Sequence, residues 1–225
     1  MSQCTALIVG ATGLVGSHLL SHVLGDRRFD RAIVFGRRPT GVSHVKLSEH
    51  IVDFDAPETW SARLSGDVLF SALGTTIRAA GSKAAQWRVD HTYQLETART
   101  AAANGVPCCV LISSAGASAD SRVFYTRMKG QIEDDMASLG LARLHILRPG
   151  ILTGPRSGRR PGEEIGVKLI RALNAAGLFR AYRPIHADAV ARAMIVAAFR
   201  PDPFRIYEPA EVFELAADAG LQSAI

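Results

Sequence analysis

The chain has 225 residues and a mass of 24.1 kDa, which predicts a single domain able to bury a core without a metal or disulfide. Hydrophobic residues make up 48% and charged residues 21%, a composition that excludes a wholly disordered, collagen-like or coiled-coil chain. The formal net charge is +5, but the basic residues are scattered and are not interleaved with aromatic ones. A polyanionic small ligand therefore explains them better than a nucleic acid does.

Signals for export, membrane insertion and metal binding are missing from the sequence. Its three cysteines, two of them adjacent, fit neither a disulfide framework nor a CxxC metal site, so we expect reduced thiols and no metal. No basic segment followed by a long apolar run marks a signal peptide, and no apolar run approaches the ~18 residues of a membrane span. These features predict a cytoplasmic protein without a membrane span.

Short apolar runs alternate along the chain with amphipathic stretches, which is typical of a parallel sheet covered by helices. The predicted strands are 6–9, 32–35, 50–52, 68–70, 108–112 and 144–147. The predicted helices are roughly 14–24, 83–103, 122–139 and 164–176. The right-handedness of strand–helix–strand connections then favours an α/β fold with a doubly wound parallel sheet and helices on both faces.

The segment 149–187 interrupts this rhythm, because glycine and proline crowd a span that also carries Arg156, Arg159 and Arg160. This composition predicts a long loop, and long loops in compact domains are often functional. The three arginines fit a solvated loop by default, and a lid that meets an anionic substrate as the second interpretation.

The chain after this loop is expected to add one more helix, a short strand and a final helix. Asp188 is placed to cap the first of these helices, which runs through Phe199. We take residues 1–225 as one domain, with 149–187 and 200–225 as a substrate-side loop and a small C-terminal cap.

A glycine-rich turn of the GxxGxxG type, Gly10 to Gly16, follows the first predicted strand and opens the first predicted helix. Glycine is needed where the backbone turns tightly and lets a pyrophosphate approach amide N–H groups at a helix N-terminus. The context favours a dinucleotide site over a purely structural turn. No Gly-Lys-Ser/Thr follows, so ATP or GTP hydrolysis has no support.

The end of the second strand indicates which dinucleotide is bound. An NAD site places an acidic residue there for the ribose hydroxyls, whereas this chain has Arg37 and Arg38. A guanidinium pairs with the 2′-phosphate of NADP, so we expect NADP (NADPH), with one of the two arginines solvated. Asp53, at the end of the third strand, lies within expected reach of the adenine amine or is a simple surface residue.

A serine, a tyrosine and a lysine follow the fifth strand in an order that indicates proton transfer. Ser114 lies at the carboxyl end of that strand, where ligands bind in such sheets, and Tyr125 and Lys129 are four residues apart on one helix face. An unperturbed tyrosine has a pKa near ~10, and a lysine ammonium close by lowers the pKa of such a hydroxyl. The set predicts a carbonyl–alcohol oxidoreductase.

With the glycine turn and the serine, tyrosine and lysine in this order, the sequence resembles the short-chain dehydrogenase/reductase superfamily in its atypical or extended branch. Within that branch it looks most like the Tat-interacting-protein-like oxidoreductases and their bacterial relatives. The segments that carry this closer resemblance are Leu73 to Thr76, Val89-Asp90, Ser113-Ser114, Tyr125 to Gly130, Leu147 to Gly150 and Arg159 to Glu163. The resemblance covers about residues 4 to 200, and it implies an NAD(P)-binding Rossmann fold.

The resemblance also implies a role for each matching residue. Ser114 would orient the substrate, Tyr125 would act as general acid/base, and Lys129 would bind the nicotinamide ribose and tune Tyr125. The cofactor-binding residues would be Gly10, Thr12, Gly13, Leu14 and Val15 at the pyrophosphate, Arg37 at the 2′-phosphate, Leu73 and Gly74 at the ribose, and Pro149 and Ile151 at the nicotinamide.

One departure from the superfamily pattern concerns the helix before the fifth strand. Many members have an asparagine there that supports the lysine through water, and this chain has Asp90 instead. Asp90 fits either a role in organising the lysine or a structural one.

Together these features predict an NADP-dependent oxidoreductase that transfers hydride between NADPH and a small carbonyl or alcohol substrate. Two alternatives stay open: an NADPH-binding regulatory protein without turnover, and an isomerase or epimerase with a tightly held cofactor. Either a monomer or a homodimer fits the sequence.

Overall fold

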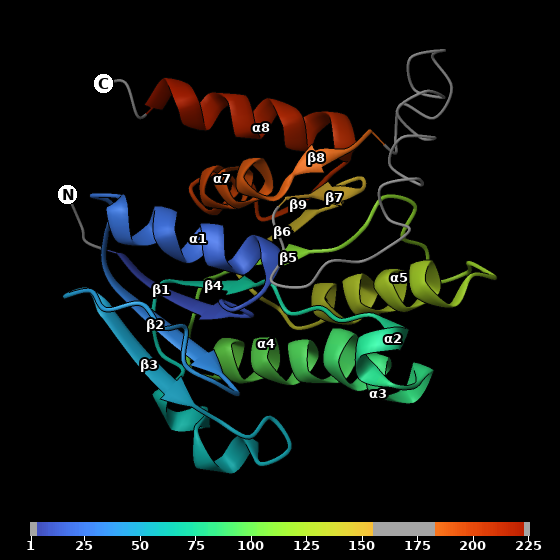
Figure 1. Cartoon of the computed structure of the whole chain (residues 1–225), viewed down its shortest axis with the longest axis horizontal. Coiled ribbons are helices and arrows are strands. Elements are labelled where there is room, and N and C mark those ends of the chain that lie inside the picture. The colour runs from blue at the N-terminus through green and yellow to red at the C-terminus, as the bar shows by residue number, and fades with distance from the viewer. Residues whose placement is uncertain (1–3, 155–182, 223–225) are drawn as a thin grey trace.

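A computed structural model describes residues 4–154 and 183–222 of the chain (Figure 1). Seven parallel strands form the main sheet, in the order β3-β2-β1-β4-β5-β6-β9. They are β1 Cys4–Val9, β2 Phe29–Gly36, β3 Leu47–Ile51, β4 Val68–Ser71, β5 Cys108–Ile112, β6 Arg143–Leu147 and β9 Phe204–Tyr207. A separate two-stranded ribbon pairs β7 Leu152–Thr153 with β8 Ile185–His186. The predicted doubly wound parallel sheet is confirmed.

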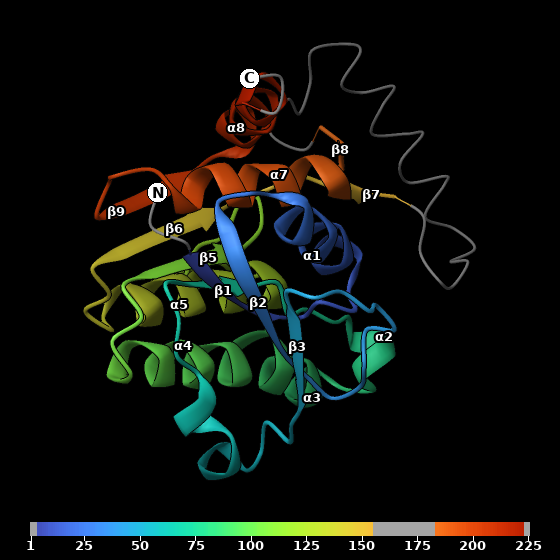
Figure 2. The same ribbon diagram turned by 90° about the vertical axis from the view of Figure 1, so that its left-hand side faces the viewer.

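Helices cover both faces of this sheet, as Figures 1 and 2 show from two directions. The helices α1, α7 and α8 lie on one side, and α4 and α5 lie on the other with the short α2 and α3 beside them. Their bounds are α1 Leu14–Gly25, α2 Ile77–Ala80, α3 Lys83–Trp87, α4 Tyr93–Ala103, α5 Phe124–Ala137, α7 Ala187–Ala198 and α8 Pro209–Gln222. A π-helical turn, Arg88–Thr92, joins α3 to α4, and 3-10 turns lie at Pro57–Thr59 and Ser61–Arg63.

Alternation along each strand divides the core into two layers. In β1, Ala6 and Ile8 pack with α1 and α7, whereas Leu7 and Val9 pack toward the opposite layer that includes α4 and α5. Both sets are fully buried, which explains why the strand reads as one continuous apolar run rather than as an alternating one.

The sheet order reverses beside β1, and this reversal locates the ligand crevice. The strand β1 pairs with β2 on one side and with β4 on the other, all in parallel. The loops that leave β1 and β4 therefore diverge at the carboxyl ends of the strands, where open α/β sheets bind ligands.

The strands and helices predicted from the sequence are found within a few residues, with some differences. The third strand is Leu47–Ile51 rather than 50–52, and α2 and the β7–β8 ribbon had no predicted counterpart. The N-cap of α7 is His186, whose ring accepts the Asp188 N–H at 3.3 Å, so Asp188 lies in the first turn and is not the cap. The predicted helix 164–176 lies outside the described residues.

The segment 200–225 was assigned to a C-terminal cap. Of its described part, β9 is the last strand of the main sheet and α8 packs with α7 in the core layer. Among the helices that the structure describes, none is long and apolar enough to cross a membrane.

Candidate functional site

The glycine turn is held tightly against the end of β4. Gly10 has φ +86°, and a Cβ there would lie 2.4 Å from the carbonyl carbon of Ala72. A Cβ on Gly16 would lie 2.1 Å from the Gly10 carbonyl oxygen, which itself accepts the Gly13 N–H at 2.9 Å. Only glycine fits at position 10, because the backbone after β4 lies directly against it, and at position 16, because the start of α1 is packed onto the turn.

The N-terminus of α1 opens into a cleft beside this turn. Gly13 is its N-cap and provides no side-chain acceptor for the first-turn N–H groups. Cavities of about 450 and 830 Å³ meet here and share Thr12, Gly13 and the Ala72–Gly74 backbone, so we treat them as one cleft. Unsatisfied N–H groups and the positive end of a helix dipole form an anion site, which fits a pyrophosphate.

The smaller cavity leads from the glycine turn to the end of β2. Arg37 and Arg38 both line it, and the Arg38 Nε lies 3.5 Å from the Thr12 hydroxyl. Asp53 is not among its lining residues: its carboxylate accepts the Asp55 N–H at 2.9 Å, and the adjacent Phe54 lines the wall instead. The adenine contact predicted for Asp53 stays a prediction.

The larger cavity reaches the predicted catalytic helix. Tyr125 and Lys129 line it together with Leu14 and Val15, so α1 and α5 meet across one space. The Tyr125 side chain is half-exposed, whereas Lys129 is only 3% exposed. The Lys129 Nζ lies 3.5 Å from the carbonyl oxygen of Ile112, at the end of β5. The exposed hydroxyl and the buried ammonium fit a proton donor and the group that supports it.

Gly130 lets the loop after β5 lie against α5. A Cβ on this residue would lie 2.1 Å from the Ala119 nitrogen, and the same loop donates its Ser118 N–H to the Thr126 carbonyl at 3.0 Å. We expect Gly130→Ala to lower the free energy of unfolding by about 1–3 kcal/mol, because backbone atoms cannot yield as a side chain can. Urea unfolding of the variant measures this, with Gly25→Ala as the control, since nothing lies within 4 Å of a Cβ there. Equal losses in the two variants would contradict the close approach.

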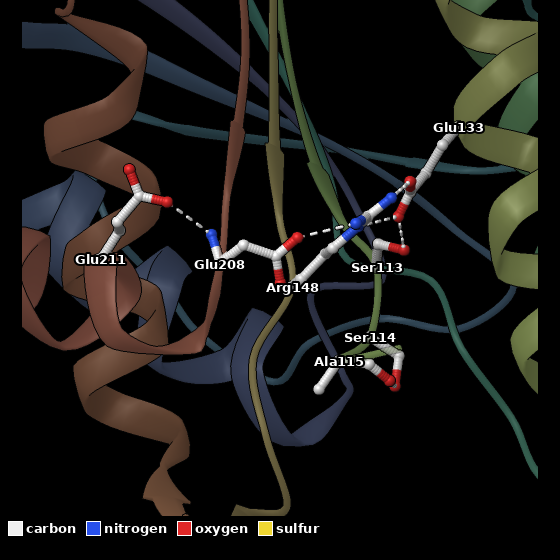
Figure 3. A network of polar contacts seen from close by, with 7 residues as sticks. All are labelled: Ser113, Ser114, Ala115, Glu133, Arg148, Glu208 and Glu211. Atoms are coloured by element: carbon white, nitrogen blue, oxygen red, sulfur yellow. Dashed lines mark hydrogen bonds and ion pairs between the residues drawn. The ribbon is translucent and has the colours of Figure 1, made fainter. Parts of the chain in front are cut away.

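Two neighbouring serines at the end of β5 have different surroundings (Figure 3). Ser113 is buried and donates its hydroxyl to Glu133 of α5, which also accepts the Arg148 Nε at 3.1 Å. Arg148 continues to Glu208 at 2.7 Å. Ser114 lies outside this network, and its hydroxyl makes a long 3.4 Å contact with the Ala115 carbonyl. Ser113 lines the cleft and Ser114 does not, so the substrate role predicted for Ser114 stays a prediction.

The π-helical turn before α4 carries a buried carboxylate into the cleft. Asp90 is 1% exposed, accepts the Thr75 N–H at 2.8 Å, and lies 3.6 Å from the Lys129 Nζ. Burial raises the pKa of the Asp90 carboxyl, while Lys129 and the Thr75 N–H act in the opposite direction. The departure noted in the sequence thus places a charge partner directly beside the predicted catalytic lysine.

The two residues expected at the nicotinamide, Pro149 and Ile151, are not among those that line the described cleft. Pro149 is buried and accepts the Ala115 N–H at 3.0 Å, and the Ile151 carbonyl accepts the Ile185 N–H at 2.9 Å. The next residue, Leu152, lines the cleft in their place. Arg156, Arg159 and Arg160 lie outside the described residues.

The structure therefore brings most of the predicted site into one space. The predicted residues that line the cleft are Gly10, Thr12, Gly13, Leu14, Val15, Arg37, Arg38, Leu73, Gly74, Tyr125 and Lys129. Sequence reasoning missed Glu133, although its position four residues after Lys129 places it on the same helix face as Tyr125 and Lys129.

Comparison with curated proteins shows which family shares this sequence. A mitochondrial Fmp52 protein from Eremothecium gossypii is 36% identical over 217 residues, which cover 93% of this chain and 96% of that protein. Another, from Aspergillus niger, is 38% identical over 165 residues, 70% of each chain. The chain belongs to the Fmp52 family. No family model matches it.

Solved structures share the fold of the Fmp52 chain. The Bordetella bronchiseptica enzyme WbmG in complex with NAD superposes with a TM-score of 0.68 at 16% identity, covering 96% of this chain and 78% of that one. A UDP-N-acetylglucosamine 4-epimerase from Methanobrevibacter ruminantium gives 0.69 at 14% identity, covering 97% and 82%. The implied Rossmann fold is confirmed, and at these identities the likeness concerns the fold alone.

The comparison corrects one prediction made from the sequence. A cytoplasmic location was expected because no export or membrane signal was found, yet the Fmp52 relatives from Eremothecium gossypii and Aspergillus niger, 36% and 38% identical, are named mitochondrial proteins. The cytoplasmic prediction is therefore contradicted. Composition and short motifs do not report the compartment in which a Rossmann domain works.

Proposed function

We propose that this Fmp52 protein binds NADP(H) in the cleft and interconverts a carbonyl and an alcohol, with Tyr125 as the general acid/base. The observation that carries the proposal is the single cleft, in which an uncapped helix N-terminus, two arginines, Tyr125 and Lys129 line connected space. A protein of similar fold supports the proposed dinucleotide site, since WbmG was solved in complex with NAD.

The residues present fit a dinucleotide along the length of the cleft. Gly10 and Gly16 leave no room for a Cβ, so the turn presents backbone rather than side chain to the pyrophosphate. Arg37 and Arg38 at the end of β2 would pair with a 2′-phosphate, which distinguishes NADP from NAD. The closer likeness to the Tat-interacting-protein-like oxidoreductases belongs to this proposal as well.

The chain's own residues would supply position and a proton. The nicotinamide, when bound, supplies or accepts the hydride. The Tyr125 hydroxyl donates a proton to the developing alkoxide oxygen during reduction and takes it back during oxidation. Lys129 keeps positive charge near that hydroxyl, and Ser114 is proposed to orient the substrate oxygen.

Cofactor choice is tested by titrating the purified protein with NADPH and NADH in a thermal-unfolding assay. NADPH at about 100 times its Kd is expected to add about 2.7 kcal/mol of stability, which raises Tm visibly. We expect Arg37→Ala to weaken NADPH at least about tenfold and to leave NADH nearly unchanged, since only the charged hydrogen bond to the 2′-phosphate is lost.

Arg31→Ala is the matched control, because Arg31 lies on β2 but is exposed and does not line the cleft. Its NADPH affinity should equal that of the wild type. A protein that binds neither dinucleotide would contradict the whole proposal, and equal affinity for both would contradict the role of Arg37.

Turnover separates the proposal from its two alternatives. A regulatory protein would bind NADPH without consuming it in the presence of any carbonyl, and an epimerase would change substrate stereochemistry without net NADPH oxidation. Net loss of NADPH absorbance with a carbonyl panel is the result expected here.

A further inference from the structure

The pair formed by Asp90 and Lys129 is the most deeply buried ionic contact lining the cleft in the part of the chain that the structure describes. Their side chains are 2% and 3% exposed, and the Asp90 oxygen and the Lys129 Nζ lie 3.6 Å apart. Removing one member of a buried pair leaves an uncompensated charge, which is strongly unfavourable. Each group therefore compensates the buried charge of the other.

The two carboxylate oxygens of Asp90 face different partners. One accepts the Thr75 N–H from the loop after β4, and the other faces Lys129 on α5. The Thr75 carbonyl is held in turn by the buried Gln86 side chain at 3.2 Å. One side chain thus joins the cleft wall at Leu73–Thr76 to the helix that carries Tyr125.

The backbone of Asp90 is itself fixed. It lies in the π-helical turn Arg88–Thr92, a conformation often found at functional sites. The Asp90 carbonyl accepts the Gln94 side-chain N–H at 2.6 Å, and Gln94 accepts the Ser71 hydroxyl at 2.7 Å. Gln94 is fully buried, and it links the Asp90 backbone to Ser71 at the end of β4.

We propose that Asp90 is a positioning residue that holds the Lys129 ammonium in place and aimed at the cleft through a direct charge pair. This inference rests on the proposed function, because Lys129 matters for turnover only if Tyr125 transfers a proton. Without the carboxylate, the buried ammonium has no charge partner to hold it beside Tyr125.

Other charged groups around the pair come from each element that packs against it. On α5, Tyr125 lies one turn before Lys129, and Glu133 one turn after it is held by Arg148. On the π-helical turn, the His91 ring lies 2.9 Å from Asp135, and burial lowers the pKa of His91. The Leu73–Thr76 loop carries no charged side chain.

A double-mutant cycle on the cofactor-free protein tests the pair without any turnover. The variants are Asp90→Asn, Lys129→Met and the two combined, with Tm measured for each. We expect each single variant to lower Tm. The loss in Tm of the double variant is expected to be much smaller than the sum of the two single losses, because the double variant leaves no lone buried charge. Additive losses would overturn the pair whether or not the protein is an enzyme.

The pH profile of turnover tests the positioning role. Asp90→Asn keeps an oxygen for the Thr75 N–H but removes the charge that holds the Lys129 ammonium near Tyr125. A nearby ammonium lowers the pKa of a tyrosine hydroxyl, so the alkaline limb of kcat/KM for carbonyl reduction is expected to move to higher pH by about one unit or more. Gln86→Ala is the control, since it loosens the same loop and leaves the charge pair intact. If the alkaline limb of kcat/KM does not move in Asp90→Asn, or moves equally in Gln86→Ala, then Asp90 has only a structural role. If the wild-type protein shows no turnover, the proposed function is overturned instead. The double-mutant cycle would then still show whether Asp90 and Lys129 form a charge pair.

Discussion

Replacing Glu133 by alanine is expected to lower the free energy of unfolding by about 3–5 kcal/mol, because the change leaves the Arg148 guanidinium without its buried partner. Glu133 is 3% exposed and Arg148 19% exposed, so water replaces little of what is lost. The carboxylate accepts the Arg148 Nε at 3.1 and 3.2 Å and also the Ser113 hydroxyl. Its proximity raises the pKa of Arg148. The guanidinium stays charged after the change as well, because an arginine without any partner is already protonated at neutral pH.

Glu208→Ala provides a matched control on the same arginine. Glu208 lies 2.7 Å from Arg148, but its side chain is 52% exposed, so water replaces much of the interaction. We expect a loss below about 1 kcal/mol. Urea unfolding of both variants measures the difference. Similar losses would show that burial does not govern this network.

The network of Glu133 and Arg148 affects the candidate site through backbone hydrogen bonds at the ends of β5 and β6. The Ser113 N–H bonds the Leu147 carbonyl at 2.8 Å and the Ala115 N–H bonds the Pro149 carbonyl at 3.0 Å, so the ends of β5 and β6 are fastened together. Glu133 and Arg148 clamp the same two strand ends to α5 (Figure 3). The position of Ser114 therefore depends on a contact that it does not itself make.

The fold was predictable because its strands are buried on both faces. Ala6 to Val9 alternate between two helix layers, yet all four are apolar, and such runs separated by helical periodicity leave one topology favoured. The glycine turn was predictable for a different reason, since the approach of Gly10 to Ala72 excludes any other residue type. Local sequence carries both signals.

Contacts made by residues distant in sequence were not predictable. Asp90 and Lys129 are thirty-nine positions apart, and Asp90 approaches Lys129 from the π-helical turn that joins α3 to α4. Ser113 and Ser114 are adjacent and identical in type, so only their environments distinguish them: one hydroxyl is held by Glu133 and the other is not in that network. Sequence patterns fix which residues lie on a helix face, but not which partner that face meets.

Replacing Tyr125 by phenylalanine is expected to lower kcat about 10²–10⁴-fold, because the ring keeps its place while the proton donor is lost. Tyr125 lies at the start of α5 and is 38% exposed toward the cleft, so the hydroxyl is available to a substrate without unpacking the core. NADPH affinity should change little, since the residues proposed to hold the pyrophosphate and the 2′-phosphate lie in the glycine turn, at the start of α1 and directly after β2. Steady-state rates and NADPH titration of the variant measure the two effects separately.

Tyr207→Phe is the control for this change. Tyr207 is buried on β9, where its hydroxyl lies 3.2 Å from the His145 ring, and it does not line the cleft. This variant should keep full turnover and lose only about 1 kcal/mol of stability for the missing hydrogen bond. A Tyr125→Phe protein with full turnover would remove the general acid/base from the proposal. If turnover and NADPH affinity fell together, Tyr125 would shape the cofactor cleft rather than move a proton, and the two measurements together decide between these roles.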